Sequence, residues 1–151
     1  MVLEPIFLII NGLALAVCAV ALWKGETPER GAGGLLLLSM AFNILPSIFL
    51  PAGYFPLVEL IGDGLTALGL LALTMMYGRL WLGAALLFQA AQFTLHSFYL
   101  VTERTNDLFH AVVNNVNFLG IMLSMALGTA FAVRRRLARR RAEAEAPVQA
   151  S

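Results

Sequence analysis

Residues 111–133 read AVVNNVNFLGIMLSMALGTAFAV, and residues 134–141 read RRRLARRR. An apolar segment of this length is typical of a transmembrane helix, because about 20 residues are needed to cross the hydrocarbon core of a bilayer. Basic residues directly after such a segment indicate its cytoplasmic end. We therefore predict an anchor on anionic lipid at the cytoplasmic face. The anchor comprises Arg134, Arg135, Arg136, Arg139, Arg140 and Arg141.

The composition of the whole chain agrees with a membrane protein. Of the 151 residues, 60% are hydrophobic and 13% are charged, whereas about a quarter of a soluble domain is charged. The length allows one compact unit, which we divide into a transmembrane domain over 1–133 and a cytoplasmic tail without fixed structure over 134–151. Cys18 is the only cysteine, so an intramolecular disulfide and a CxxC motif are excluded.

Four further apolar segments precede the one before the arginines. Proline, glycine and charged residues separate the segments, and Pro46 is expected to kink the second or end it early. The stretch 24–34 is predicted to be a flexible loop, and 102–109 a polar connection. The sequence therefore predicts an all-α, five-helix transmembrane bundle. Its segments run over about 5–23, 35–50, 57–77, 80–101 and 110–133.

The distribution of basic residues predicts the orientation of this bundle. With the C-terminus in the cytoplasm, five spans place the N-terminus outside. Lys24, Arg30 and Arg79 then join the tail arginines inside, and Arg104 alone lies outside, as the positive-inside rule requires. The first five residues lack the basic region of a signal peptide. We therefore expect an uncleaved first helix in a multi-pass protein of the cell inner (plasma) membrane.

Polar residues recur with helical spacing in the outer halves of the last three segments. Spacings of i, i+4, i+7 and of i, i+3, i+7 place each set on one helix face, within an arc of about 60°. Polar side chains in a membrane usually face the bundle interior, so the stripes are predicted to meet in a ligand pocket. The predicted pocket residues are Asn11, Asn43, Glu59, Asp63, Gln89, Gln92, His96, His110, Asn114 and Asn117.

A second pattern in the last segment concerns packing. Gly120, Ser124 and Gly128 form a small-xxx-small-xxx-small run, which allows a neighbouring helix to approach closely. This run lies on the cytoplasmic side of the polar stripe, where the segments are almost purely apolar. We therefore predict tight packing in the inner half and a polar pocket in the outer half.

Several functions fit such a pocket, and no enzyme motif selects among them. The sequence contains no GxSxG, P-loop, HExxH or glycine-rich dinucleotide loop, and the basic tail lacks the aromatic or base-reading groups of a nucleic-acid-binding segment. The first hypothesis is an accessory or small-ligand-binding subunit, in a larger membrane complex or a homo-oligomer. Structural hydrogen bonding between helices, a transporter and a proton relay are further alternatives.

The remaining alternative is a metal or haem centre, with or without redox activity. Two imidazoles and two carboxylates at similar depth suit zinc or iron, and two histidines on neighbouring helices suit the axial positions of a haem. The residues of this alternative are His96, His110, Asp63 and Glu59.

Overall fold

The computed structural model describes residues 3–49, 51, 54–105 and 107–145. This part of the chain forms five α-helices and contains no strand, so the predicted all-helical fold is confirmed. The helices are α1 (Leu3–Lys24), α2 (Thr27–Phe49), α3 (Phe55–Tyr77), α4 (Leu80–Val101) and α5 (Leu108–Glu145).

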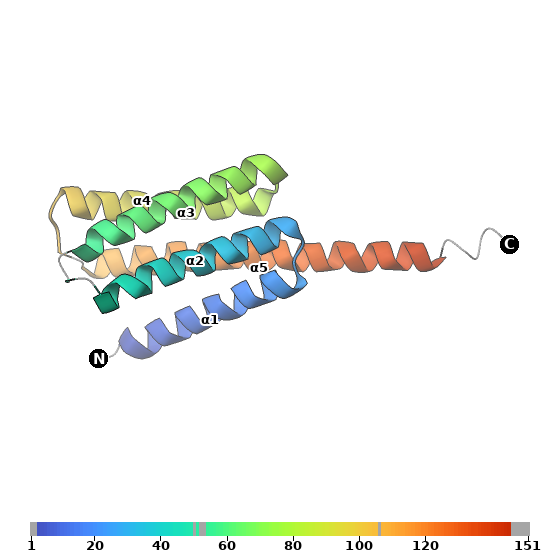
Figure 1. The fold of residues 1–151 in the computed structure, drawn as a ribbon, viewed down its shortest axis with the longest axis horizontal. Helices are drawn as coiled ribbons and strands as arrows, with labels where there is room; N and C mark the ends of the chain where they lie inside the picture. Colours follow the sequence, from blue (N-terminus) through green and yellow to red (C-terminus); the bar gives the residue numbers. More distant parts are fainter. Residues whose placement is uncertain (1–2, 50, 52–53, 106, 146–151) are drawn as a thin grey trace.

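The helices form a closed ring in which each packs on its neighbours in sequence and α5 closes the ring by packing on α1. Figure 1 shows the chain turning back at each connection, so that the N-terminus and the α2–α3 and α4–α5 connections lie at one end. We call this the N-terminal end. The α1–α2 and α3–α4 connections lie at the opposite end, where α5 projects beyond the other helices; we call this the arginine end.

Helix α2 begins earlier than predicted. It starts at Thr27 and includes the glycine-rich stretch that was expected to be a loop over 24–34. A Cβ atom on Gly33 would lie 3.3 Å from the Cβ atom of Ala21 and from the carbonyl oxygen of Cys18. The glycine therefore lets α2 pack closely on α1, so this stretch belongs to a helix interface. At its other end α2 continues past Pro46 to Phe49, so the proline does not end the helix.

Among the described residues, three helices are long and apolar enough to cross a membrane, by length and composition. They cover Phe55–Tyr77, Leu80–Val101 and Leu108–Ala144, which correspond to α3, α4 and most of α5. In α1, the apolar stretch within the described residues covers Leu8–Lys24. By length and composition, the three segments match the third, fourth and fifth predicted spans.

Helix α5 continues through the arginine cluster to Glu145. The sequence predicts a tail without fixed structure over 134–151, but the structure has a helix over the first twelve of these residues. Residues 146–151 lie outside the described residues. Arginine, alanine, leucine and glutamate are all strong helix formers, and they make up most of this segment. The helix thus extends about three turns past Val133, where the continuous apolar segment ends.

Two of the six predicted anchor arginines contact protein instead of facing solvent. Arg135 Nη2 lies 3.5 Å from Glu26 Oε2 and 3.9 Å from Glu29 Oε1. Arg136 Nη2 donates to the carbonyl oxygen of Gly25 at 3.3 Å. Glu29 is fully buried, and its Oε2 atom accepts a hydrogen bond from the Glu26 backbone N–H at 3.0 Å. These contacts fasten α5 to the α1–α2 connection, a role that the sequence pattern did not indicate.

The small residues of α5 lie against α4. Gly120 faces the ring of Phe88, and Gly128 faces the indole of Trp81, at positions where a Cβ atom would come within 2.7 Å and 2.5 Å of those rings. Ser124 is buried between them and donates to the carbonyl oxygen of Gly120 at 2.8 Å. The gaps left by the glycines are thus filled by aromatic rings, which hold α4 and α5 together toward the arginine end.

Candidate functional site

A buried polar cluster joins α3 to α4 in the half of the bundle near its N-terminal end. Gln89 Nε2 donates to Asp63 Oδ1 at 3.0 Å and to the Asp63 carbonyl oxygen at 3.3 Å. His96 Nδ1 pairs with Asp63 Oδ2. All three side chains are buried: Gln89 is 3% exposed, Asp63 is 4% exposed and His96 is 9% exposed. Gln89 and His96 are seven residues apart, so both lie on the face of α4 that meets α3.

A layer of aromatic side chains lies between this cluster and the N-terminal end. The His96 and His110 ring centroids are 5.2 Å apart, which brings α4 into contact with α5. Tyr99 meets His110 edge to face, with centroids 4.7 Å apart. Tyr99 is buried and lies three residues after His96. It therefore continues the polar face of α4 by one further turn.

Asp107 connects this layer to the start of α5. Its Oδ1 atom accepts hydrogen bonds from the Tyr99 hydroxyl at 2.6 Å and from the His110 backbone N–H at 2.9 Å. Asp107 directly precedes the first residue of the helix, where aspartate is a favoured N-cap. Arg104 Nη2 lies 3.6 Å from Asp107 Oδ2, and the Arg104 guanidinium lies 5.8 Å from the Tyr99 ring centroid. The α4–α5 connection is thus held by its own polar contacts.

These contacts lead to a prediction about pH. The Tyr99 hydroxyl and then the His110 N–H hold the pKa of the Asp107 carboxyl below its usual value. The ionised carboxylate therefore stabilises the fold above the unfolded pKa of about 4, and this stabilisation is lost as the pH falls through the lower folded pKa. Asp107→Asn keeps the cap and removes the charge. We expect the stability difference between wild type and this variant to shrink as the pH is lowered from about 6 to about 2, as measured by unfolding at each pH. A difference that stays constant would contradict the assignment.

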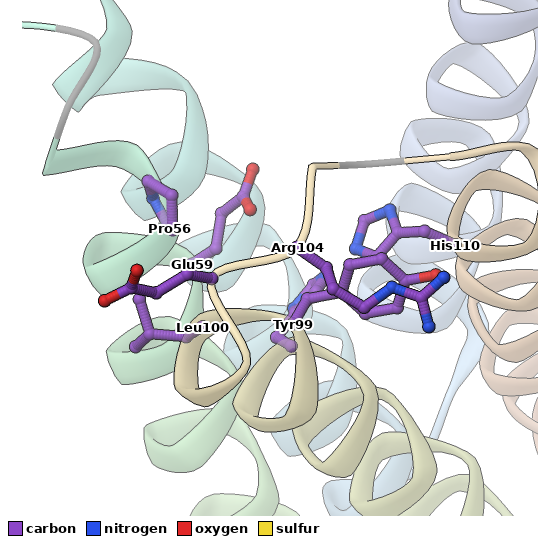
Figure 2. Close-up of a pocket in the computed structure, with 8 residues that line it drawn as sticks. Pro56, Glu59, Tyr99, Leu100, Arg104 and His110 are labelled. Atoms are coloured by element: carbon purple, nitrogen blue, oxygen red, sulfur yellow. The ribbon is translucent and has the colours of Figure 1, made fainter.

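A pocket of about 230 Å³ opens beside these residues at the N-terminal end. Figure 2 shows Pro56, Glu59 and Leu100 on one side of this pocket and Tyr99, Arg104 and His110 on the other. His96 and Glu103 complete the lining. The pocket therefore gathers acidic, imidazole, phenol and guanidinium groups from α3, from the end of α4, from the connection and from the start of α5.

No protein-family model, curated protein or solved structure matches this chain. The site is therefore interpreted from its own geometry and chemistry. The side chains that line the pocket include two glutamates, two histidines, a tyrosine and an arginine. Asp63 fixes the orientation of the His96 imidazole through Nδ1. An oriented imidazole among carboxylates suits the binding of a polar ligand or the exchange of a proton with one.

The four residues of the metal alternative lie near one another without forming a metal-binding group. Asp63 pairs with His96, whose ring lies against His110, and Glu59 lines the same pocket as both histidines. Within the described residues, no three or more His, Cys, Asp and Glu side chains are arranged so as to hold a metal ion. The metal or haem centre stays a prediction from the sequence, and the geometry adds no support to it.

The other predicted pocket residues differ in their surroundings. Asn114 and Asn117 continue the polar stripe of α5, and Asn114 Oδ1 and Asn117 Nδ2 are buried without a hydrogen-bond partner among the described residues. Gln92 is half-buried on α4. Asn43 is exposed and donates to the Ser39 carbonyl oxygen of its own helix, so it lies outside the cluster. Asn11 is half-buried on α1, which packs mainly on α2 and α5.

Sequence reasoning missed four residues of the site, namely Tyr99, Glu103, Arg104 and Asp107. Two local signals were present. Tyr99 follows Gln89, Gln92 and His96 at helical spacing, and an aspartate directly before an apolar run is a typical helix start. For Glu103 and Arg104 no signal was available, because their positions depend on how the α4–α5 connection folds back over the pocket.

Proposed function

We propose that this protein is a membrane-embedded accessory or ligand-binding subunit whose pocket at the N-terminal end takes a small organic cation. The distribution of polar and apolar side chains supports the placement in a membrane. The excess of carboxylates around the pocket supports the choice of a cation as the ligand.

The membrane placement is supported by side chains arranged in the reverse of a soluble bundle. Asp63, Gln89 and His96 are buried, whereas large apolar side chains cover the outer surface of all five helices. In water such a surface would be a strong aggregation hazard, but in a bilayer it faces acyl chains. The polar interior then satisfies its hydrogen bonds inside the bundle. Placing the arginine end in the cytoplasm and the N-terminal end outside follows the positive-inside rule.

The ligand class is supported by the charges at the pocket. Four carboxylates lie in or directly behind its lining, those of Glu59, Asp63, Glu103 and Asp107. Arg104 is the one guanidinium of the lining and is already paired with Asp107. Glu59 and Glu103 have no ion pair with a basic side chain in the described part of the chain.

The walls of the pocket suit the same class of ligand. Two carboxylates without a basic partner attract a cation, and the pocket also includes Tyr99, whose aromatic ring is of a kind on which ammonium groups bind. The volume of about 230 Å³ limits the ligand to a small molecule. The ligand class that fits both the charge and the size of the pocket is therefore a small ammonium compound.

The test is a binding measurement on purified protein in mild detergent. We expect tetramethylammonium to bind and to raise the midpoint of thermal unfolding, whereas acetate at the same concentration does not. Glu59→Gln keeps the size and polarity of the side chain but removes a charge from the pocket, and should weaken binding on the order of tenfold, the equivalent of about 1.4 kcal/mol. Glu143→Gln, on the exposed end of α5, is the control and should leave binding unchanged. Binding of acetate in preference to tetramethylammonium would refute the proposed ligand class.

A further inference from the structure

A second hollow lies far from the pocket described above, between α1 and α5 at the arginine end. It has a volume of about 620 Å³, within the range of about 300–1,000 Å³ that is usual for small-molecule sites. Its walls are almost entirely apolar, and the one hydroxyl among them, that of Thr129, already donates to the Met125 carbonyl oxygen at 2.9 Å. The residues that define it here are Ala16, Val20, Lys24, Ala130, Val133 and Arg134.

The end of this groove carries two cations without acidic partners. Lys24 closes the α1 side and Arg134 the α5 side, and neither forms an ion pair in the described part of the chain. The next arginine, Arg135, contacts Glu26 instead. Lys24 Nζ lies 4.3 Å from the Trp23 ring centroid, which places a tryptophan beside the same end. The groove is therefore apolar along its length and positively charged at its mouth.

The length of the groove distinguishes between two kinds of occupant. Ala16 and Lys24 are eight residues apart on α1, which corresponds to about 12 Å along the helix axis. This length fits within one leaflet, since the whole hydrocarbon core is about 30 Å thick. A transmembrane helix of a partner would need a surface over the full thickness. An acyl chain with a charged headgroup at the interface needs only one leaflet.

We infer that the α1–α5 groove binds one chain of an anionic phospholipid, with the phosphate of its headgroup held by Lys24 and Arg134. Charge complementarity selects the headgroup, and the small side chains of Ala16 and Ala130 make room for the acyl chain. This inference rests on the proposed membrane placement but not on the pocket at the N-terminal end. Arg134 would then bind one defined lipid headgroup, which goes beyond the general attraction of basic residues to an anionic surface.

Bromine-labelled lipids test this site because bromine quenches a nearby tryptophan. Trp23 is 75% exposed at the mouth of the groove, and Trp81→Phe removes the other tryptophan of the chain. The full-length protein with this substitution is reconstituted in phosphatidylcholine vesicles that contain brominated phosphatidylglycerol or, in parallel, brominated phosphatidylcholine. We expect quenching of Trp23 to show a preference for phosphatidylglycerol on the order of tenfold, as two basic groups near a negatively charged headgroup would produce.

Two pairs of variants separate a site from general attraction. Lys24→Gln with Arg134→Gln should abolish the preference, whereas Arg139→Gln with Arg140→Gln removes the same charge from positions outside the groove and should preserve it. Ala130→Leu should also abolish it by filling the groove, whereas Ala90→Leu, at an exposed position on α4, should not.

Three results would overturn the inference. A preference that survives Ala130→Leu, or that falls equally with the Arg139 and Arg140 pair, would indicate surface attraction alone. If brominated phosphatidylglycerol does not quench Trp23, and if Ala130→Leu dissociates a dimer of the protein, the groove binds a second copy of the chain instead of a lipid. Absence of quenching by either lipid would contradict the membrane placement itself, whatever the outcome of the tetramethylammonium measurement.

Discussion

Replacing Asp63 by alanine is expected to lower the free energy of unfolding by about 3–5 kcal/mol, the usual cost of removing one partner from a buried charge pair. The carboxylate accepts from Gln89 Nε2 and pairs with His96 Nδ1, and all three residues are buried. Without it, two polar groups lose their partner in a site that water barely reaches. The measurement is reversible unfolding of the purified protein in mixed detergent and dodecyl sulfate micelles.

The matched control for this prediction is Ser97→Ala on α4. The Ser97 hydroxyl donates only to the Phe93 carbonyl oxygen of its own helix, at 2.7 Å, so we expect a change below about 1 kcal/mol. Asp63→Asn should lie between the two, since its amide can still accept from Gln89. If Asp63→Ala is as stable as Ser97→Ala, the buried cluster does not hold α3 and α4 together. If Asp63→Asn folds but loses tetramethylammonium binding, Asp63 serves the ligand as well as the fold.

Replacing Gly128 by leucine is expected to produce the second large effect. A Cβ atom at this position would already lie 2.5 Å from the Trp81 indole, and leucine adds three further carbon atoms. Overpacking of this kind typically costs about 1–3 kcal/mol. We expect Gly128→Leu at the upper end of that range or beyond it, because the ring of Trp81 must move out of the space between α4 and α5. The same unfolding assay in mixed micelles measures the change.

A comparison of two alanine variants separates packing from helix propensity. Gly128→Ala and Gly83→Ala make the same substitution within a helix, but a Cβ atom on Gly83 meets nothing within 4 Å. Alanine is the better helix former by up to about 1 kcal/mol, so Gly83→Ala should leave stability unchanged or raise it. Gly128→Ala should lower it. Equal effects at the two positions would refute the role assigned to Gly128.

The polar faces of the helices could be predicted from periodicity, because a stripe at helical spacing must face one side. This reasoning brought Asp63, Gln89, His96 and His110 to one region, where the structure also has them. Periodicity does not say which residues pair, however. Asn43 is predicted to lie at the same depth in the membrane as these residues, but its side chain donates to a carbonyl oxygen of its own helix. Which way Asn43 faces depends on the rotation of α2 about its axis.

The contacts that the sequence did not reveal depend on chain segments meeting at the two ends of the bundle. Glu29 and Arg135 are more than a hundred residues apart, and their contact requires α5 to continue as a helix past the apolar segment. At the other end, Arg104 and Asp107 reach the pocket only because the α4–α5 connection folds back over Tyr99. Counting charges along the sequence predicts neither set of contacts, since it carries no information on local geometry.

In the proposed orientation, the pocket lies at the outer side of the membrane and the arginine end lies in the cytoplasm. Labelling of single cysteines with a membrane-impermeant maleimide in intact cells tests it most directly. Cys18→Ala provides the background, and Glu103→Cys and Arg139→Cys place one thiol at each end. We expect the thiol at 103 to be labelled in intact cells and the thiol at 139 to react only after permeabilisation. Labelling of 139 in intact cells, with 103 protected until permeabilisation, would contradict it.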